Sequence, residues 1–159
     1  GEICLRSPAN MVGYWKLPEA TDKTLVDGWI HTGDAGYLDK DGYIFICDRI
    51  KDMICYASEN VYPAEVENIL YQHPAIADVA VIGVPDPQWG EAIKAMVVLK
   101  PDAAATHLDI INFARGKIAN FKLPRTVDFI ETLPRTPSGK VQKGKLRDPY
   151  WQSYERKVH

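Results

Sequence analysis

The sequence predicts an α+β fold, with a β-rich first part followed by a small part in which helices pack on a short sheet in three layers. The chain has 159 residues, 46% apolar and 25% charged, which is the composition of an ordinary globular protein. The first fifty residues carry apolar segments separated by glycine turns, which favour antiparallel strands. Over the next hundred residues, β-branched segments alternate with segments of helical spacing, which favours a layered α+β arrangement.

A short strand and a hairpin are predicted in the first part. Ile3 to Leu5 form the strand, which ends before Ser7-Pro8. The hairpin is predicted where Asp41-Gly42 separates the apolar segments 36–38 and 43–46, because its turn needs a positive φ that glycine adopts without strain.

Helix starts are the clearest signals in the second part. Pro63 suits the first position of a helix, where an N–H has no intrahelical partner, and apolar residues follow it at helical spacing. Thr106 has the hydroxyl group of a helix cap. The predicted elements are strands over 53–56, 76–84, 92–99 and 126–130, and helices from 63, over 108–118, and from 144 to a break at Pro149.

Composition excludes several classes of function. The formal net charge is −2, so no overall field favours nucleic acid or an anionic membrane. No apolar stretch reaches the roughly 20 residues that a membrane helix needs. The three cysteines, Cys4, Cys47 and Cys55, form no C-x-x-C pair, which favours reduced thiols in a cytoplasmic protein. The four histidines have no ligand spacing, so no metal site is predicted.

Basic residues gather in the last third of the sequence. Nine basic residues lie from Arg115 to Arg147, and the only acidic residues in this stretch are Asp128 and Glu131. On charge alone, this stretch is either a solvated face or a surface that meets phosphates.

Three motifs carry the functional information. Residues 133–148 read LPRTPSGKVQKGKLRD and place Lys140 after a Pro-Ser-Gly turn, residues 48–67 read DRIKDMICYASENVYPAEVE, and Thr32-Gly33-Asp34 precedes both. In this order they resemble the C-terminal part of the acyl-adenylate-forming enzymes, which include acyl-CoA synthetases, adenylation domains of peptide synthetases and luciferases. The resemblance covers nearly the whole chain and implies a piece of a larger enzyme, in keeping with a first residue, Gly1, that is not methionine.

The resemblance implies two parts. Residues 1–50 would be the β-rich end of the large N-terminal domain, and residues 51–159 the small, mobile C-terminal domain, with Lys51 and Asp52 at the hinge. The alternative for these two residues is an ordinary charged loop. Residues 1–50 would lack their usual partner, the missing N-terminal domain, so exposed sheet edges would allow self-association.

Lys140 matches the catalytic lysine of the resembled family. A positioned ammonium group can stabilise the negative charge that develops on the α-phosphate when a carboxylate attacks ATP. Without the motif around it, a single lysine in a loop would be taken as a surface residue. Lys143, Lys145 and Arg147 are interpreted as solvated charges or as weak attraction for phosphate.

Asp34 and Arg49 match the two family residues that approach the ribose of the nucleotide, and Thr32 belongs to the same motif as Asp34. A carboxylate at a tight glycine turn can accept hydrogen bonds from two neighbouring ribose hydroxyls. The alternatives are a turn aspartate that satisfies its own backbone, and a surface ion pair of Arg49 with Asp48 or Asp52, which would contribute little.

In a second orientation of the small domain, the segment with Ala57, Ser58 and Glu59 would line the tunnel for the thiol acceptor. Many family members have two glycines where this chain has Ala57 and Ser58, and alanine and serine tolerate a positive φ less well. The cofactors that the resemblance implies are ATP, Mg²⁺ and CoA.

Three functions remain open. The first is the C-terminal part of an ATP-dependent acyl-CoA synthetase, inactive without its N-terminal domain, with a fatty or other carboxylic acid and CoA as partners and no nucleic acid. The second is an adenylation enzyme that loads a carrier protein. The third is a stand-alone, non-catalytic binding module. The acyl pocket is expected in the N-terminal domain, so this chain does not specify the acid.

Overall fold

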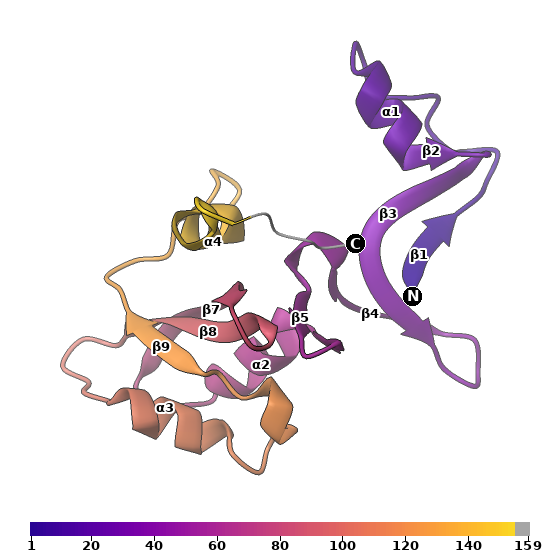
Figure 1. Ribbon diagram of the computed structural model, residues 1–159. Helices are drawn as coiled ribbons and strands as arrows, with labels where there is room; N and C mark the ends of the chain where they lie inside the picture. Colours follow the sequence, from indigo (N-terminus) through magenta and orange to yellow (C-terminus); the bar gives the residue numbers. More distant parts are fainter. Residues whose placement is uncertain (155–159) are drawn as a thin grey trace. The chain divides into compact units, whose positions relative to one another are not determined.

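A computed structural model describes residues 1–154. The chain divides into two compact units, Gly1–Lys51 and Asp52–His159, called here the N-terminal unit and the C-terminal unit. Both contain helices and sheets, which confirms the predicted α+β class (Figure 1). The N-terminal unit has β1 (Glu2–Leu5), α1 (Pro18–Thr24), β2 (Leu25–Val26), β3 (Trp29–Leu38) and β4 (Ile44–Arg49). After a 3₁₀ turn (Ile50–Asp52), the C-terminal unit has β5 (Ile54–Tyr56), β6 (Glu59–Val61), α2 (Pro63–Leu70), β7 (Ile76–Asp86), β8 (Gly90–Leu99), α3 (His107–Ala114), a second 3₁₀ turn (Asn120–Lys122), β9 (Thr126–Phe129) and α4 (Lys143–Trp151).

An antiparallel sheet forms most of the N-terminal unit. β1, β2 and β4 all pair with β3. The predicted hairpin is the β3–β4 pair, and in its turn the Asp39 carboxylate accepts hydrogen bonds from the amides of Asp41 and Tyr43, each at 2.9 Å. Gly42 takes the expected positive φ, at 85°. The hairpin prediction is therefore confirmed.

Helix α1 is an element that the predictions lack. It begins at Pro18, with Glu19 in its first turn and Lys23 in its last, which is the charge order that the helix dipole favours. None of its residues is buried, so the apolar periodicity that usually reveals a helix is missing. The proline and the charge order are the signals that could have found it.

The C-terminal unit is built on a five-stranded sheet. Its strand order is β6-β5-β8-β7, with β9 also paired to β8. The long β7–β8 ladder is antiparallel and runs from the Ile76–Leu99 pair to the Asp86–Gly90 pair. β9 pairs with β8 in parallel.

Helices cover both faces of this sheet, which gives the predicted three layers (Figure 1). On one face, α2 and α3 pack over a core that includes the fully buried Ile54, Val66, Leu70, Ile93 and Ile110. On the other face, Leu146 and Tyr150 of α4 pack against a second cluster, which consists of Ala80, Ile82, Val84, Ala92, Met96 and Leu133. No helix among the described residues is both long and apolar enough to cross a membrane.

Thr106 caps α3 as predicted. Its hydroxyl accepts a hydrogen bond from the Asp109 amide at 3.2 Å, and the Asp109 carboxylate accepts one from the Thr106 amide at 2.8 Å, which completes a capping box. The helix ends at Ala114 rather than at the predicted Ile118, because the backbone turns at Gly116, where φ is +78°.

The predicted break at Pro149 is wrong, because α4 includes this proline and continues to Trp151. Two hydrogen bonds hold the turn that follows it. The Tyr150 hydroxyl donates to Asp128 at 2.7 Å, and the Trp151 indole donates to the Gly83 carbonyl at 2.9 Å. These tertiary contacts offset the backbone hydrogen bond that a proline removes.

Candidate functional site

The Thr32-Gly33-Asp34 motif lies in a bulge of β3 rather than in the predicted tight turn. On either side of the motif, β3 pairs with β1, at His31 and at Ala35. The partners in β1 are Cys4 and Glu2, and one residue separates them. In β3, the three residues of the motif separate His31 from Ala35, so β3 bulges at the motif. The backbone bends at Gly33, where φ is +70°. The strand continues past the motif because both flanks remain paired.

Thr32, Asp34 and Arg49 are brought together at this bulge. Arg49 Nη1 donates to Asp34 Oδ1 at 2.8 Å, and the two residues are partners across the β3–β4 pair. The Thr32 hydroxyl donates to the Ile3 carbonyl at 2.7 Å and accepts from the Asp34 amide at 3.1 Å. Asp34 and Arg49 are both partly exposed. A carboxylate that accepts and a guanidinium that donates at one place suit a ligand with neighbouring hydroxyl groups.

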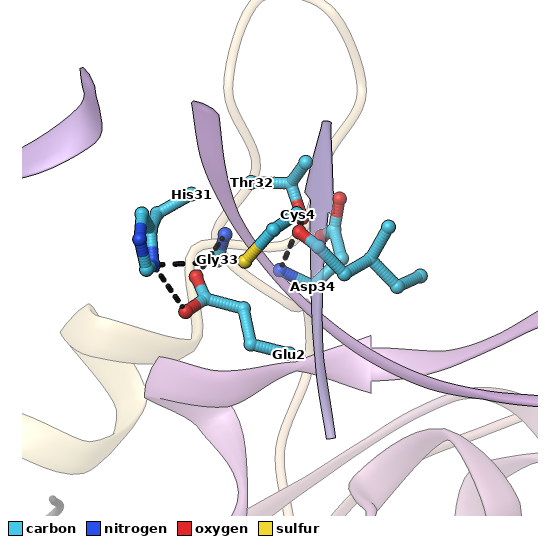
Figure 2. Close-up of polar contacts among 7 residues, drawn as sticks. Glu2, Cys4, His31, Thr32, Gly33 and Asp34 are labelled. Carbon is cyan, nitrogen blue, oxygen red and sulfur yellow. Dashed lines mark hydrogen bonds and ion pairs between the residues drawn. The ribbon is translucent and has the colours of Figure 1, made fainter. Parts of the chain in front are cut away.

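Glu2 and His31 brace the bulge, as Figure 2 shows. Glu2 Oε2 lies 2.8 Å from His31 Nδ1, and Glu2 Oε1 accepts from the Gly33 amide at 3.0 Å. The hydrogen bond with His31 lowers the pKa of Glu2; burial opposes this effect, and the Gly33 amide adds to it. Sequence reasoning missed the pair because 29 residues separate Glu2 from His31, and only the pairing of β1 with β3 brings them together.

The same corner of the sheet holds the one group of three metal-ligand side chains found within residues 1–154. Glu2, Cys4 and His31 offer ligand atoms that lie within 4.8 Å of one another, and Cys4 Sγ lies 3.7 Å from His31 Nδ1 (Figure 2). These side-chain types can bind Zn²⁺, although Glu2 and His31 already bond each other. The group escaped prediction because its members come from two strands and show no spacing motif.

Lys140 lies on a closed turn between β9 and α4. The Thr136 amide donates to the Lys140 carbonyl at 2.8 Å, and the Gly139 amide donates to the Thr136 carbonyl at 2.9 Å. The Lys140 amide in turn donates to Thr136 Oγ1 at 3.1 Å. Lys140 is exposed, so the turn presents its ammonium group on a backbone that is hydrogen-bonded to itself. Lys140 belongs to the C-terminal unit, whereas Asp34 and Arg49 belong to the N-terminal unit.

The two residues expected at the hinge lie where the chain passes from one unit to the other. Lys51 and Asp52 belong to the 3₁₀ turn, and the division between the units falls between them. Arg147 Nη1 of α4 lies 3.6 Å from Asp52 Oδ1, and only 11% of the Asp52 side chain is exposed. Asp52 is therefore anchored to the C-terminal unit, whereas Lys51 is exposed.

Ala57 and Ser58 form the turn between β5 and β6, with φ angles of +49° and +70°. Both residues adopt the left-handed backbone that a two-residue hairpin turn requires and that glycine adopts more easily. The Ala57 amide donates to the Trp89 carbonyl at 3.1 Å, which ties the turn to the start of β8. Glu59 follows in β6 and is exposed. The turn thus has the positive φ angles that glycine usually supplies, but alanine and serine occupy it.

A basic cavity that the sequence did not predict lies beside this turn. It has a volume of about 560 Å³, and its lining includes Tyr56, Arg115, Asn120, Phe121 and Arg125. The Arg125 guanidinium donates a hydrogen bond to the Tyr56 hydroxyl and lies 5.3 Å from the centre of the Tyr56 ring. Arginines beside aromatic rings suit a ligand with phosphates and a flat base. The basic stretch of the sequence hinted at phosphate binding, but charge alone did not reveal a cavity.

Other basic side chains of that stretch are paired within the C-terminal unit. Lys143 Nζ lies 2.8 Å from Glu67 Oε1, with 14% and 15% of the two side chains exposed. Arg147 is the partner of Asp52 described above, and its own side chain is 18% exposed. The interpretation of these two residues as solvated charges is therefore wrong, whereas Lys145 is exposed as expected.

Residues 65–140 match the family of AMP-binding enzyme C-terminal domains. ScoC, a fatty acid–[acyl-carrier-protein] ligase of Streptomyces coeruleorubidus, is 54% identical over 159 residues, which are 100% of this chain and 31% of that protein. A feruloyl-CoA synthase of Amycolatopsis sp is 48% identical over 147 residues, which cover 92% of this chain and 30% of that protein. The chain thus spans about a third of the length of the curated relatives that it matches.

Solved structures extend the likeness beyond the matched domain. ATP-bound MatB from Rhodopseudomonas palustris superposes with a TM-score of 0.86 at 38% identity, over 98% of this chain and 31% of that one. The likeness therefore covers nearly the whole chain, including the segments that carry Thr32, Asp34 and Arg49.

Proposed function

We propose that this chain, which carries an AMP-binding enzyme C-terminal domain over residues 65–140, is the C-terminal part of an AMP-forming acyl-CoA synthetase. In the first step, a carboxylate oxygen bonds to the α-phosphorus of ATP and pyrophosphate leaves. In the second step, the CoA thiol loses its proton, its sulfur bonds to the acyl carbon and AMP leaves. The observation that carries the proposal is the exposed Lys140 on its closed turn, inside the matched domain.

In the first step, Lys140 stabilises the negative charge that develops on the α-phosphoryl oxygens, as a positioned cation does where charge grows in a transition state. Asp34 accepts hydrogen bonds from the ribose hydroxyls. Arg49 orients the Asp34 carboxylate through their 2.8 Å ion pair, and Thr32 fixes the bulge through its bonds to the backbone. Because Lys140 and Asp34 belong to different units, this step requires both.

In the second step, the C-terminal unit rotates about Lys51 and presents the turn with Ala57, Ser58 and Glu59 to the acyl-AMP. A rotation of this kind needs only a few backbone torsions to change at the end of an element. The basic cavity next to the turn supports this assignment, because Arg115 and Arg125 would meet the phosphates of CoA while the turn guides its thiol arm.

The parent enzyme uses ATP with Mg²⁺ in the first step and CoA in the second, and it works in the cytoplasm. Mg²⁺ prefers phosphate and carboxylate oxygens. In this chain the candidate nucleotide carboxylate, Asp34, already faces the cation of Arg49, so it suits hydroxyl groups better than a metal ion. No step is therefore assigned to a metal held by these residues.

A carrier protein is the second candidate for the thiol acceptor. The observation that favours it is the 54% identity with ScoC, whose name makes it a ligase of fatty acids to acyl carrier protein. Both acceptors end in a thiol on a long flexible arm, so the first step and the role of Lys140 are the same. The two candidates differ in whether the basic cavity is needed.

The test uses the intact parent enzyme. Carboxylate-dependent exchange of labelled pyrophosphate into ATP is expected, and the acyl-AMP is then offered to CoA and to an acyl carrier protein in parallel. Thioester formed with CoA supports the first candidate, and thioester formed only with the carrier protein supports the second. Absence of exchange with every carboxylic acid tried would exclude both and leave a non-catalytic module. As a control, the isolated chain is expected to form no acyl-AMP.

A further inference from the structure

One guanidinium group ties the Lys140 turn to the central sheet of the C-terminal unit. Arg135 Nη1 donates to the Gly139 carbonyl at 2.6 Å, next to Lys140 itself. Arg135 Nη2 donates to Asp78 Oδ2 on β7 at 2.5 Å. The same planar group therefore bonds the tip of the turn on one side and a fixed strand on the other.

The Asp78 end of this tether is itself held in place. The Tyr71 hydroxyl donates to Asp78 Oδ1 at 2.5 Å, and the Val79 amide donates to the same oxygen at 3.0 Å. Burial raises the pKa of Asp78. The hydrogen bonds from Tyr71 and Arg135 together lower this pKa by a larger amount, so its net shift is downwards. The carboxylate is therefore ionised at neutral pH and remains a strong acceptor for the guanidinium.

The base of the turn is closed as well. Arg135 and Val141 form an antiparallel bridge, and the Gln142 amide donates to the Pro134 carbonyl at 2.8 Å. Together with the bonds between Thr136 and Lys140, these contacts fix the backbone on both sides of the lysine. The remaining freedom lies in the Lys140 side chain, so the direction in which it leaves the turn is set before any ligand binds.

We propose that Arg135, anchored by Asp78, is a positioning residue for Lys140 in the adenylation step. The proposal rests on the function proposed above. A charge that is already oriented need not be ordered during the reaction, and small misplacements of a reacting group have large effects on rate. The turn then moves as a rigid part of the C-terminal unit, and Lys140 reaches and leaves the phosphate by rotation of that unit rather than by bending of a loose loop.

An arginine suits this task better than a lysine. Its fork of donors can bond a carbonyl and a carboxylate at the same time, whereas an ammonium group on a flexible stem acts as a single point charge. The pair with Asp78 is partly exposed, with 42% of the Arg135 side chain accessible, and ion pairs of this kind add little to global stability. Loss of Arg135 is therefore expected to change the rate of one step rather than the fold.

The experiment compares Arg135→Ala, Arg135→Lys and Asp78→Asn with the wild-type parent enzyme. Pyrophosphate exchange reports the first half-reaction, thioester formation from pre-made acyl-AMP reports the second, and thermal unfolding reports the fold. We expect kcat for exchange to fall by up to about 100-fold in Arg135→Ala, with the KM for ATP nearly unchanged and the second half-reaction at its wild-type rate. Arg135→Lys and Asp78→Asn should give smaller losses in the same direction.

Two further variants make the result decisive. Lys100→Ala removes a cation from the same unit that bonds the Pro74 carbonyl and not the Lys140 turn, and it should leave both half-reactions unchanged. Exchange at the wild-type rate in Arg135→Ala, or an equal loss in both half-reactions, would overturn the positioning role. Lys140→Ala separates a failure of the positioning role from a failure of the proposed function. If pyrophosphate exchange survives Lys140→Ala, the role proposed for Lys140 itself is wrong.

Discussion

The two units of the chain differ in how well they bury their own apolar side chains. In the C-terminal unit, helices on both faces of the sheet enclose two core clusters. In the N-terminal unit, the described residues include a single buried hydrophobic residue, Ala35. Large apolar side chains of its hairpin are exposed instead, namely Tyr37, Leu38, Tyr43, Ile44, Phe45 and Ile46. The C-terminal unit therefore has the buried core that an independent domain needs. The N-terminal unit has a sheet without a second layer packed on it.

This difference supports the view that the N-terminal unit is completed by other parts of a larger protein. A sheet needs a layer packed on its apolar face, and exposed apolar patches of this kind mark sites of association. The relatives, of which this chain spans about a third, have the length to supply that layer. Self-association of the isolated chain through exposed sheet edges stays a prediction.

The largest effect is expected when the units are separated. A polypeptide of residues 52–159 should fold cooperatively, because both core clusters lie within it. A polypeptide of residues 1–51 should remain largely unfolded, because a small sheet with one exposed face cannot offset the entropy of ordering its backbone. Circular dichroism during urea titration measures both. A cooperative transition in residues 1–51 alone would contradict the claim that only the C-terminal unit folds by itself.

Single substitutions sharpen the same contrast. Ile93→Ala in the C-terminal unit removes a side chain that is 0% exposed and should lower the free energy of unfolding by about 2–5 kcal/mol. Leu38→Ala in the N-terminal unit removes a side chain that is 67% exposed and should change it by less than about 0.5 kcal/mol. Urea unfolding of the whole chain gives both values, and similar losses in the two variants would contradict the account.

A smaller effect is expected from acid. Burial raises the pKa of Asp128. The hydrogen bonds from Lys94 and Tyr150 together lower it by a larger amount, so the pKa of Asp128 lies below its usual value. Burial and Asp128 also raise the pKa of Tyr150 to about 12, so this hydroxyl remains a donor at neutral pH. The folded chain keeps Asp128 ionised to a lower pH than the unfolded chain does. Its contribution to stability is thus present above the unfolded pKa, about 3.9, and is lost as the pH falls through the folded value.

Asp128→Asn should remove this part of the acid dependence from the unfolding of the C-terminal unit. The difference is expected to be about 1 kcal/mol or less, because 40% of the Asp128 side chain is exposed. Urea unfolding at a series of pH values between neutral and acid measures it. Asp148→Asn, which removes a carboxylate at an exposed position of α4, is the matched control for the change in net charge. An unchanged slope in Asp128→Asn would contradict the assigned cause.

Local patterns allowed much of the fold to be predicted. The hairpin turn at Gly42, the start of α2 at Pro63 and the cap of α3 at Thr106 each depend on a few neighbouring residues, and the structure has all three. The continuation of α4 through Pro149 could not be predicted, because it depends on hydrogen bonds to residues of β9 and β7 far along the chain.

The candidate site divides in the same way. Lys140 and the Thr32–Asp34 motif are visible in the sequence because each is a contiguous motif. Their supports are not visible, since 57 residues separate Arg135 from Asp78 and strand pairing alone brings Glu2 to the bulge. The roles assigned to Lys140 and Asp34, and the division of the chain into parts of two enzyme domains, stay predictions.

The central claim is that Lys140 serves the adenylation step and not the transfer step. The most direct test is pyrophosphate exchange by the intact parent enzyme, wild type against Lys140→Ala, paired with thioester formation from pre-made acyl-AMP. The account predicts that exchange falls by about 100-fold or more while thioester formation continues at its wild-type rate. Exchange at the wild-type rate in Lys140→Ala would show that Lys140 is an ordinary surface lysine and would contradict the account.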